Sequence, residues 1–208
     1  MIMLHPFEEL LYRRVAETVS AWEPALRHDV YALCLLYDSG ASADEEGREV
    51  DYQGYVSLCY NTRSHAQEEV ARIGTNEPEW NNAFWVHDFS FFVPAMAEYG
   101  TPPNDVELQL RDSWCASVGV NSNGTDESGR PIYNESKLYC AVTAFCGRVV
   151  RRLHEDGTIA TLLGKPVPIV IEMSDWSDDA VANTKESNPP ELLEGYLQWI
   201  YERSHPAC

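Results

Sequence analysis

Apolar residues recur near the start of the chain at the spacing of an amphipathic helix. Most positions of this stripe lie three or four residues from the next, and Pro6 stands where a missing N–H costs a helix least. The pattern stops near Pro24. The stripe consists of Phe7, Leu10, Leu11, Val15, Val19 and Trp22. These positions predict a first helix with one buried face.

Two apolar runs with strand-forming residues follow this helix. The first, VYALCLLYD, extends from Val30 to Asp38 and is rich in strand formers. In the second, YQGYVSLCYN, two sets of side chains alternate: Tyr55, Ser57 and Cys59 against Val56, Leu58 and Tyr60. A polar, acidic stretch at residues 39–51 separates the two runs. We predict two strands joined by a long acidic hairpin loop.

The middle of the chain contains one well-marked helix and one ambiguous segment. Asn61 or Thr62 can cap a helix from Arg63 to Ile73, which Gly74 ends. Residues 79–95 are dense in aromatic side chains, and their spacing fits strand and helix equally well. Buried core is the expected place for the rings of Trp80, Phe84, Trp85, Phe89, Phe91 and Phe92. The run VELQLRDSWCASVGV then predicts another helix.

The C-terminal half has the clearest helical pattern. Apolar residues fall at steps of four, three, four and four at Leu138, Val142, Phe145, Val149 and Leu153, and Gly157 ends this helix. The run PVPIVIEM predicts a strand, with Pro166 and Pro168 tolerated only at its start or at an edge. After Pro189-Pro190 a last amphipathic helix carries Leu192, Leu193, Tyr196, Leu197 and Ile200.

This order of elements predicts an α+β fold in a single domain that covers residues 1–208. Helices that alternate with a few strands can cover a small sheet, so we expect a small, mostly antiparallel sheet packed with about five helices. A chain of 208 residues suits one domain. The polar stretches at 39–51 and 121–134 have the character of insertions.

The compartment and the partner class follow from charge and from the N-terminus. The start lacks the basic-then-apolar order of a secretory signal, and no apolar run is long enough to cross a membrane, so we expect a cytoplasmic protein. The 33 acidic and 15 basic residues give a formal charge of −18. Such a field repels nucleic acid and anionic lipid and attracts a basic protein partner, although it also simply keeps a protein dissolved.

The sequence offers no familiar signature of catalysis or of cofactor binding. It lacks a glycine-rich phosphate loop, a G-x-S-x-G elbow and an H-E-x-x-H helix, and its six histidines are scattered, so we expect neither cofactor nor metal. His87-Asp88 resembles a proton-transfer couple, but neighbours on a strand point to opposite faces, which favours a structural histidine. The six cysteines form no C-x-x-C pair and are expected as mostly buried free thiols.

Acidic residues gather just after the predicted C-terminal strand. Glu172, Asp175, Asp178 and Asp179 surround Trp176 there. Three interpretations stay open: two of the carboxylates bind a metal ion or act in catalysis, Ser177 or Asp178 caps a short helix, or the surface binds a basic partner with Trp176 as its apolar anchor. Tyr52 and Tyr55, beside the acidic hairpin, are the next candidates for an aromatic anchor.

Several of these stretches together resemble a bacterial family known as domain of unknown function 4303. The similar features are the opening helix, YALCLLYD before a strand with SLCYNT, the run LHEDGTIATLLGKPVPIVIEMSD, and NTKESNPPELLEGYLQWI near the end. The resemblance covers nearly the whole chain, but the shared patterns are apolar and turn residues and supply no catalytic residues. By analogy it implies a small acidic immunity protein that neutralises a bacterial toxin.

Three functional hypotheses therefore stand. The first is a cytoplasmic binding module, an immunity protein that occludes a basic toxin domain with Glu172, Asp175, Trp176, Asp178, Asp179, Tyr52 and Tyr55. The alternative is a hydrolase or transferase with a carboxylate-centred site at Asp175 and Asp179, near His87 or His154. The third is a non-catalytic subunit of a larger assembly, held by an apolar face of the last helix.

Overall fold

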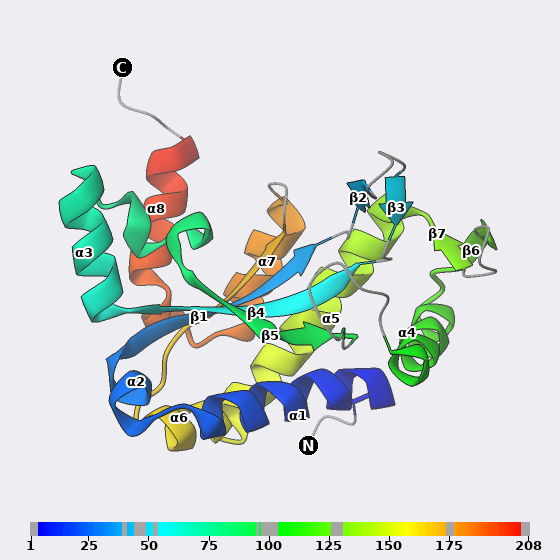
Figure 1. Ribbon diagram of the computed structural model, residues 1–208, viewed down its shortest axis with the longest axis horizontal. Coiled ribbons are helices and arrows are strands. Elements are labelled where there is room, and N and C mark those ends of the chain that lie inside the picture. Colours follow the sequence, from blue (N-terminus) through cyan, green and yellow to red (C-terminus); the bar gives the residue numbers. More distant parts are fainter. Residues whose placement is uncertain are drawn as a thin grey trace.

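A four-stranded sheet lies at the centre of the computed structural model (Figure 1). Its order is β5-β4-β1-β8, in which β5–β4 and β4–β1 are antiparallel and β1–β8 is parallel. The strands are β1 Val30–Asp38, β4 Tyr55–Thr62, β5 Val86–Val93 and β8 Ile169–Met173. The small, mostly antiparallel sheet predicted from the sequence is confirmed. The structure describes residues 4–38, 41–43, 49–51, 54–94, 96, 104–125, 131–173 and 177–204.

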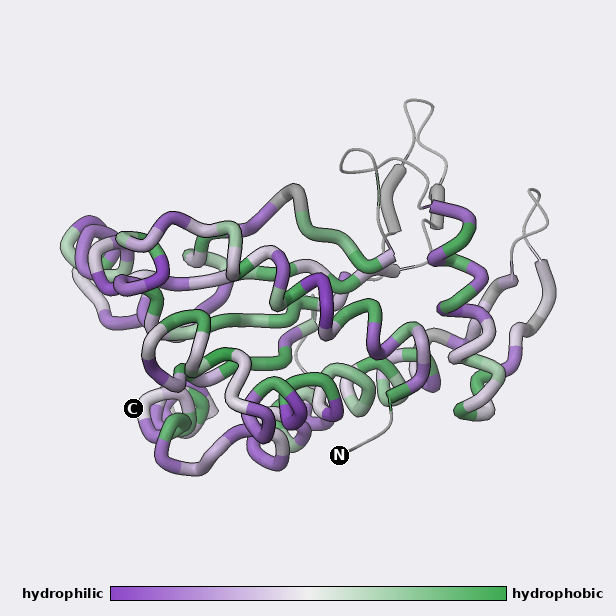
Figure 2. The backbone as a smooth tube through the Cα atoms, turned by 90° about the horizontal axis from the view of Figure 1, so that it is seen from below, coloured by the Kyte–Doolittle hydropathy of each residue, from purple (hydrophilic) through white to green (hydrophobic). Residues whose placement is uncertain are grey.

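Helices cover one face of the sheet and build the larger core on it. This core joins Leu33 and Leu35 of β1 to Leu11 of α1, Phe145 of α5 and Ile159 of α6. In Figure 2 the extended strands carry long apolar stretches, whereas the helices alternate between apolar and polar positions. The bounds are α1 Pro6–Ala21, α4 Asp105–Ser117, α5 Glu135–Glu155 and α6 Thr158–Leu163.

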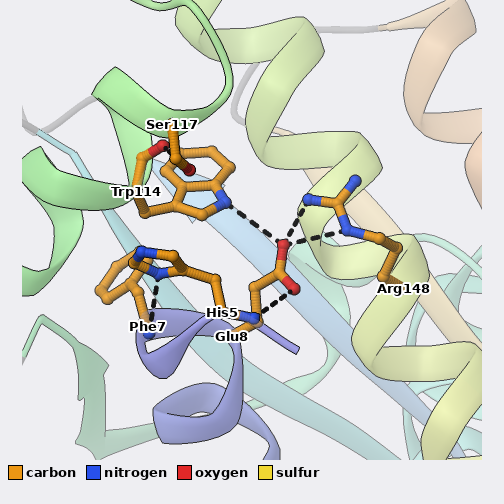
Figure 3. Close-up of polar contacts among 6 residues, drawn as sticks. All are labelled: His5, Phe7, Glu8, Trp114, Ser117 and Arg148. Atoms are coloured by element: carbon orange, nitrogen blue, oxygen red, sulfur yellow. Dashed lines mark hydrogen bonds and ion pairs between the residues drawn. The ribbon is translucent and has the colours of Figure 1, made fainter. Parts of the chain in front are cut away.

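A buried carboxylate joins three of these helices (Figure 3). Glu8 of α1 is 4% exposed, and its Oε1 accepts hydrogen bonds from Trp114 Nε1 of α4 at 3.2 Å and from Arg148 Nε of α5 at 2.9 Å. Its Oε2 accepts one from the His5 backbone at 3.1 Å, which completes the cap of α1. A buried charge is tolerated when it is paired and hydrogen-bonded, so this site is structural.

The second face of the sheet carries a smaller core under the last helix. Here Cys34 of β1 and Cys59 of β4 pack with Trp85, Tyr196 and Ile200. The elements beside this face are α8 Glu194–Ser204, with the 3₁₀ turns η1 Glu77–Glu79, η2 Asn82–Phe84 and η3 Pro190–Leu192. In Figure 1, α8 and α3 (Arg63–Ile73) stand on the opposite side of the sheet from α1 and α6.

Helix α7 (Asp178–Ser187) and its C-cap residue Asn188 cover the outer edge of β8 with their side chains. The Ile171 N–H donates to Thr184 Oγ1 at 2.9 Å, and the Ile169 N–H donates to Asn188 Oδ1 at 2.8 Å. Asn188 Nδ2 returns a hydrogen bond to the Ile169 carbonyl at 2.9 Å. These side chains stand in for a neighbouring strand, so the edge of β8 is closed to strand addition. The strand starts after Pro166 and Pro168, as predicted.

Several expectations about the elements change in detail. In the described residues there are eight α-helices instead of about five. Two of the additional helices, α2 Pro24–Asp29 and α6, have six residues each, too few for a periodic pattern to show. The expected acidic hairpin loop contains a short ladder of β2 Ala41–Ala43 and β3 Glu49–Asp51. The stretch at 121–134 contains β6 Ser122–Thr125 and β7 Pro131–Tyr133.

The aromatic segment resolves into two 3₁₀ turns followed by β5. Among its rings, Trp85, Phe91 and Phe92 are buried, as expected. Trp80 and Phe84 are only half-buried, and the side chain of Phe89 lies outside the described residues. Within the described ranges, no helix combines the length and the apolar character that spanning a membrane requires.

Candidate functional site

The acidic site residues predicted at the end of β8 lie in two different environments. Glu172 lies between the sheet and α8, and Asp178 and Asp179 lie on the surface. Glu172 lies on β8, and its Oε1 accepts a hydrogen bond from Tyr196 Oη of α8 at 3.1 Å. Burial raises the pKa of Glu172 to about 7. Its carboxyl group therefore belongs to the layer between the sheet and α8, and not to the open surface expected from the sequence.

Asp178 and Asp179 are exposed in the first turn of α7, where the helix dipole favours acidic residues. Ser177 caps the helix, since its side chain accepts a hydrogen bond from the Ala180 N–H at 3.3 Å. The Cys140 thiol of α5 donates to Asp179 Oδ2 at 3.0 Å. Among the three interpretations of this stretch, helix capping is the one that the described contacts bear out.

The remaining predicted site residues are either buried or outside the described part of the chain. Asp175, Trp176 and Tyr52 lie outside the described residues. Tyr55 is 6% exposed, and its ring meets Phe92 edge to face at 5.2 Å between centroids. Because β4 is an inner strand with both faces covered, Tyr55 does not provide the exposed anchor that the sequence predicted.

The histidines of the enzyme hypothesis occupy separate places. His87 Nδ1 lies 3.2 Å from Cys59 Sγ, and His154 Nε2 lies 3.0 Å from Asn188 Oδ1. Asn188 follows the C-terminal end of α7, whereas Asp179 lies in its first turn, roughly 14 Å away at 1.5 Å per residue. Asp179 and His154 are therefore not brought together. Among the described residues, no group of three or more His, Cys, Asp or Glu side chains could hold a metal ion.

Much of the apolar face of the last helix packs against the sheet. Tyr196 and Ile200 of α8, with Leu193 just before it, are buried in the smaller core. These three side chains are covered, whereas Leu197 is half-buried and Tyr201 is exposed on the same helix, so the subunit contact of the third hypothesis stays a prediction.

A groove between η1 and α8 combines acidic and aromatic side chains at the surface. Its volume is about 670 Å³. Exposed carboxylates of Glu77, Glu79 and Glu202 border it, and Trp80 and Trp199 form its aromatic wall. Arg203 also lines it, with its guanidinium over the Trp199 ring at 5.4 Å. We call this feature the acidic groove.

Close packing fixes the rings of the acidic groove. Trp80 lies so close to Gly195 of α8 that a Cβ at that position would come within 2.7 Å of the indole ring. Tyr196 contacts both tryptophans, with centroid separations of 6.2 Å to Trp80 and 6.1 Å to Trp199. The groove thus presents preorganised rings rather than mobile side chains, which lowers the entropy cost of binding.

Only a weak signal for this groove is present in the sequence. The runs EPEW at Glu77–Trp80 and WIYER at Trp199–Arg203 each place acids beside a tryptophan. They are far apart in the chain, and only the packing of α8 beside η1 brings them together. The pairing of Cys59 with His87 has no sequence signal at all, because it depends on strand register.

Comparison with protein-family models gave no match, and comparisons with curated proteins and with solved structures gave no significant match. The resemblance to domain of unknown function 4303 therefore stays a prediction.

Proposed function

We propose that this protein is a cytoplasmic binding module that captures a basic segment of a protein partner in the acidic groove. The observation that carries the proposal is the juxtaposition of three exposed carboxylates with two fixed tryptophan rings in one groove of about 670 Å³. This proposal keeps the class of function expected from the sequence and moves its location from the start of α7 to the groove beside α8.

Charge supports a basic partner. The chain carries a formal charge of −18, and Glu77, Glu79 and Glu202 add a local negative edge to that overall field. Complementary charge raises the association rate and selects between partners more than it raises affinity. Lys and Arg side chains entering the groove would meet these carboxylates at its border.

The two tryptophan rings of the groove supply binding energy, whereas charge mainly raises the association rate. Tryptophan and arginine dominate the energetics of protein interfaces, and a cation over an indole face is stabilised further. Arg203 already stacks over Trp199, so an indole face in this groove is compatible with a guanidinium. A partner arginine can make the same type of contact with the exposed part of the groove.

The immunity role is a finer proposal that depends on the resemblance. If the chain is related to domain of unknown function 4303, the basic partner would be a bacterial toxin domain that the groove occludes. The geometry argues for the chemistry of the partner, and the identity of the partner rests on analogy.

A short fluorescein-labelled peptide of Arg, Lys and Leu tests the groove directly. We expect saturable binding, with NMR shift changes in the folded protein centred on Trp80 and Trp199. Trp199→Ala should weaken binding by about tenfold or more, since a lost anchor costs about 1.4 kcal/mol or more. An acidic peptide of the same length should not bind.

Matched charge variants separate the groove from the overall field. Glu77→Lys with Glu202→Lys should weaken binding strongly, whereas Glu17→Lys with Glu155→Lys changes the net charge equally on α1 and α5. All four carboxylates are exposed. Equal weakening by both pairs, or shift changes spread over the whole surface, would overturn the assignment of the groove.

A further inference from the structure

Three polar side chains form a row across the middle of the sheet. In the strand register Cys59 of β4 is opposite both Cys34 of β1 and His87 of β5. Residues directly opposite each other on neighbouring strands share a face of the sheet, and this face is the one beneath α8. No part of the acidic groove belongs to this row, so the inference below is independent of the proposed function.

The contacts of the row favour a thiolate at Cys59. Cys59 Sγ is 3.2 Å from His87 Nδ1. A hydrogen bond from the Cys34 thiol, followed by the contact with His87, lowers the pKa of Cys59 to about 6 against the opposing effect of burial. The same contact raises the pKa of His87, and burial raises the pKa of Cys34. Thiolates near an imidazolium are the reactive form of cysteine.

The strand register places Cys34 and Cys59 at a Cα spacing that disulfides can span. Opposite residues of antiparallel strands have Cα atoms about 4.5 or 5.5 Å apart, depending on the type of pair. Disulfides span Cα separations of about 4.4 to 6.8 Å. Cys34 and Cys59 are both free thiols in this structure. Their placement therefore fits the Cα separation of a cross-strand disulfide.

A small surface pocket lies beside the His87 end of the row. Leu36, Ser57 and His87 are among the residues that line it, and its volume is about 260 Å³. Leu36 and Ser57 are an opposed pair further along β1 and β4, near Cys34 and Cys59. His87 is partly exposed, while both cysteines are 0% exposed. His87 is thus the member of the row that meets the pocket, and a small reagent that reaches Cys59 would pass beside it.

We propose that Cys34 and Cys59 form a redox-active dithiol that a small hydroperoxide oxidises to a disulfide. The Cys59 thiolate attacks the terminal oxygen of the hydroperoxide, so that an S–O bond forms and the O–O bond breaks. The leaving oxygen takes the proton of the His87 imidazolium and departs as an alcohol, or as water when the oxidant is hydrogen peroxide. Cys59 is then a sulfenic acid.

Cys34 completes the oxidation. Its sulfur attacks the Cys59 sulfur, the S–S bond forms, and the S–O bond breaks. The hydroxide that leaves takes the Cys34 proton and becomes water. The dithiol has given two electrons to the hydroperoxide, and a low-molecular-weight thiol can reverse the change by thiol–disulfide exchange.

Hydrogen peroxide added to the reduced full-length protein provides the test, with peptide mass spectrometry as the readout. We expect a Cys34–Cys59 linked peptide as the first product, formed while the protein stays folded by circular dichroism. Cys34→Ser should stop the reaction at a Cys59 sulfenic acid that dimedone traps. Cys59→Ser should abolish both products.

The other cysteines supply matched controls. Cys146 is buried in the larger core, where burial raises its pKa, and Cys140 is exposed on α5. Cys146→Ser and Cys140→Ser should both leave the Cys34–Cys59 product unchanged. A bulky disulfide reagent should modify Cys140 before it reaches Cys59 in the folded protein.

A pH profile distinguishes the role of His87 from a merely structural one. The titratable groups around Cys59 are Cys34 on β1, His87 on β5, Glu172 on β8 and Tyr196 on α8. The absorbance of the thiolate should titrate with a higher midpoint in His87→Gln than in the wild type, because the contact with His87 is one of the causes that lower the pKa of Cys59. Oxidation of Cys140 alone, or a Cys34–Cys59 bond formed only after unfolding, would overturn the proposal. Because the wild-type product decides the question, a variant that fails to fold leaves the test intact.

Discussion

At the scale of single residues, burial decides which acidic and aromatic side chains meet solvent. Glu172 and Tyr55 carry the residue types expected at an interface, but both face inward. Trp80, for which the sequence predicts a place in the core, instead forms a wall of the acidic groove. Sequence shows the chemistry of a side chain, and its direction depends on what the rest of the fold packs against it.

The half-buried carboxyl group of Glu172 predicts a pH dependence of stability. Its pKa is about 7 in the folded protein against an ordinary value of 4.5, so between these values the folded state binds more protons than the unfolded state. The free energy of unfolding should therefore fall as pH rises through this window and level off above it. The effect is on the order of 3 kcal/mol, because a tenfold change in proton affinity is worth about 1.36 kcal/mol.

Glu172→Gln should remove most of this dependence, since an amide keeps an acceptor for Tyr196 and carries no charge. Urea unfolding at about pH 5 and about pH 8 measures it. The free energy of unfolding of the variant minus that of the wild type should therefore increase from about pH 5 to about pH 8. Glu186→Gln, at an exposed position on α7, is the control. A difference between variant and wild type that stays constant with pH would contradict the role of Glu172.

At the scale of elements, the sequence predicts helices correctly where a cap or a long stripe is present. Thr62 accepts from the His65 N–H at 3.1 Å, and Gly74 ends α3 with a φ of 84°, as the sequence predicted. The stripe of α5 and the strands β1, β4 and β8 also follow their predicted positions. These features depend on neighbours within a few residues, which is why sequence alone reveals them.

The closure of the β8 edge by α7 supports a prediction at this scale. Thr184→Val keeps the shape of the side chain but leaves the Ile171 N–H without its acceptor, at a cost of about 1–3 kcal/mol. Asn188→Ala removes two hydrogen bonds to Ile169 and the contact with His154, and should cost more. Urea unfolding measures both.

Lys185→Ala is the control for these two variants, because Lys185 is exposed on the same helix. Its effect should stay within about 0.5 kcal/mol. If Thr184→Val proved as harmless as Lys185→Ala, the side chains of α7 would not be satisfying the edge of β8.

At the scale of the whole molecule, the charge of −18 predicts how fast a basic partner arrives. Salt screens exposed charges beyond about 10 Å at 0.1 M and beyond about 3 Å at 1 M. The association rate of the Arg-, Lys- and Leu-containing peptide should fall by about tenfold between about 0.05 and 0.5 M salt, with a smaller change in the dissociation rate. Stopped-flow fluorescence measures both rates, and an association rate indifferent to salt would contradict steering by charge.

The sequence by itself determined the α+β class, the main helices and strands, the caps and the acidic field, because each depends on local spacing or on composition. Only the tertiary structure decided that Glu172 is half-buried beneath α8, that Trp80 and Trp199 share a groove, and that Cys34, Cys59 and His87 stand in one row. These arrangements join residues far apart in the chain. They depend on strand register and on the packing of α8 against the sheet, and local pattern specifies neither.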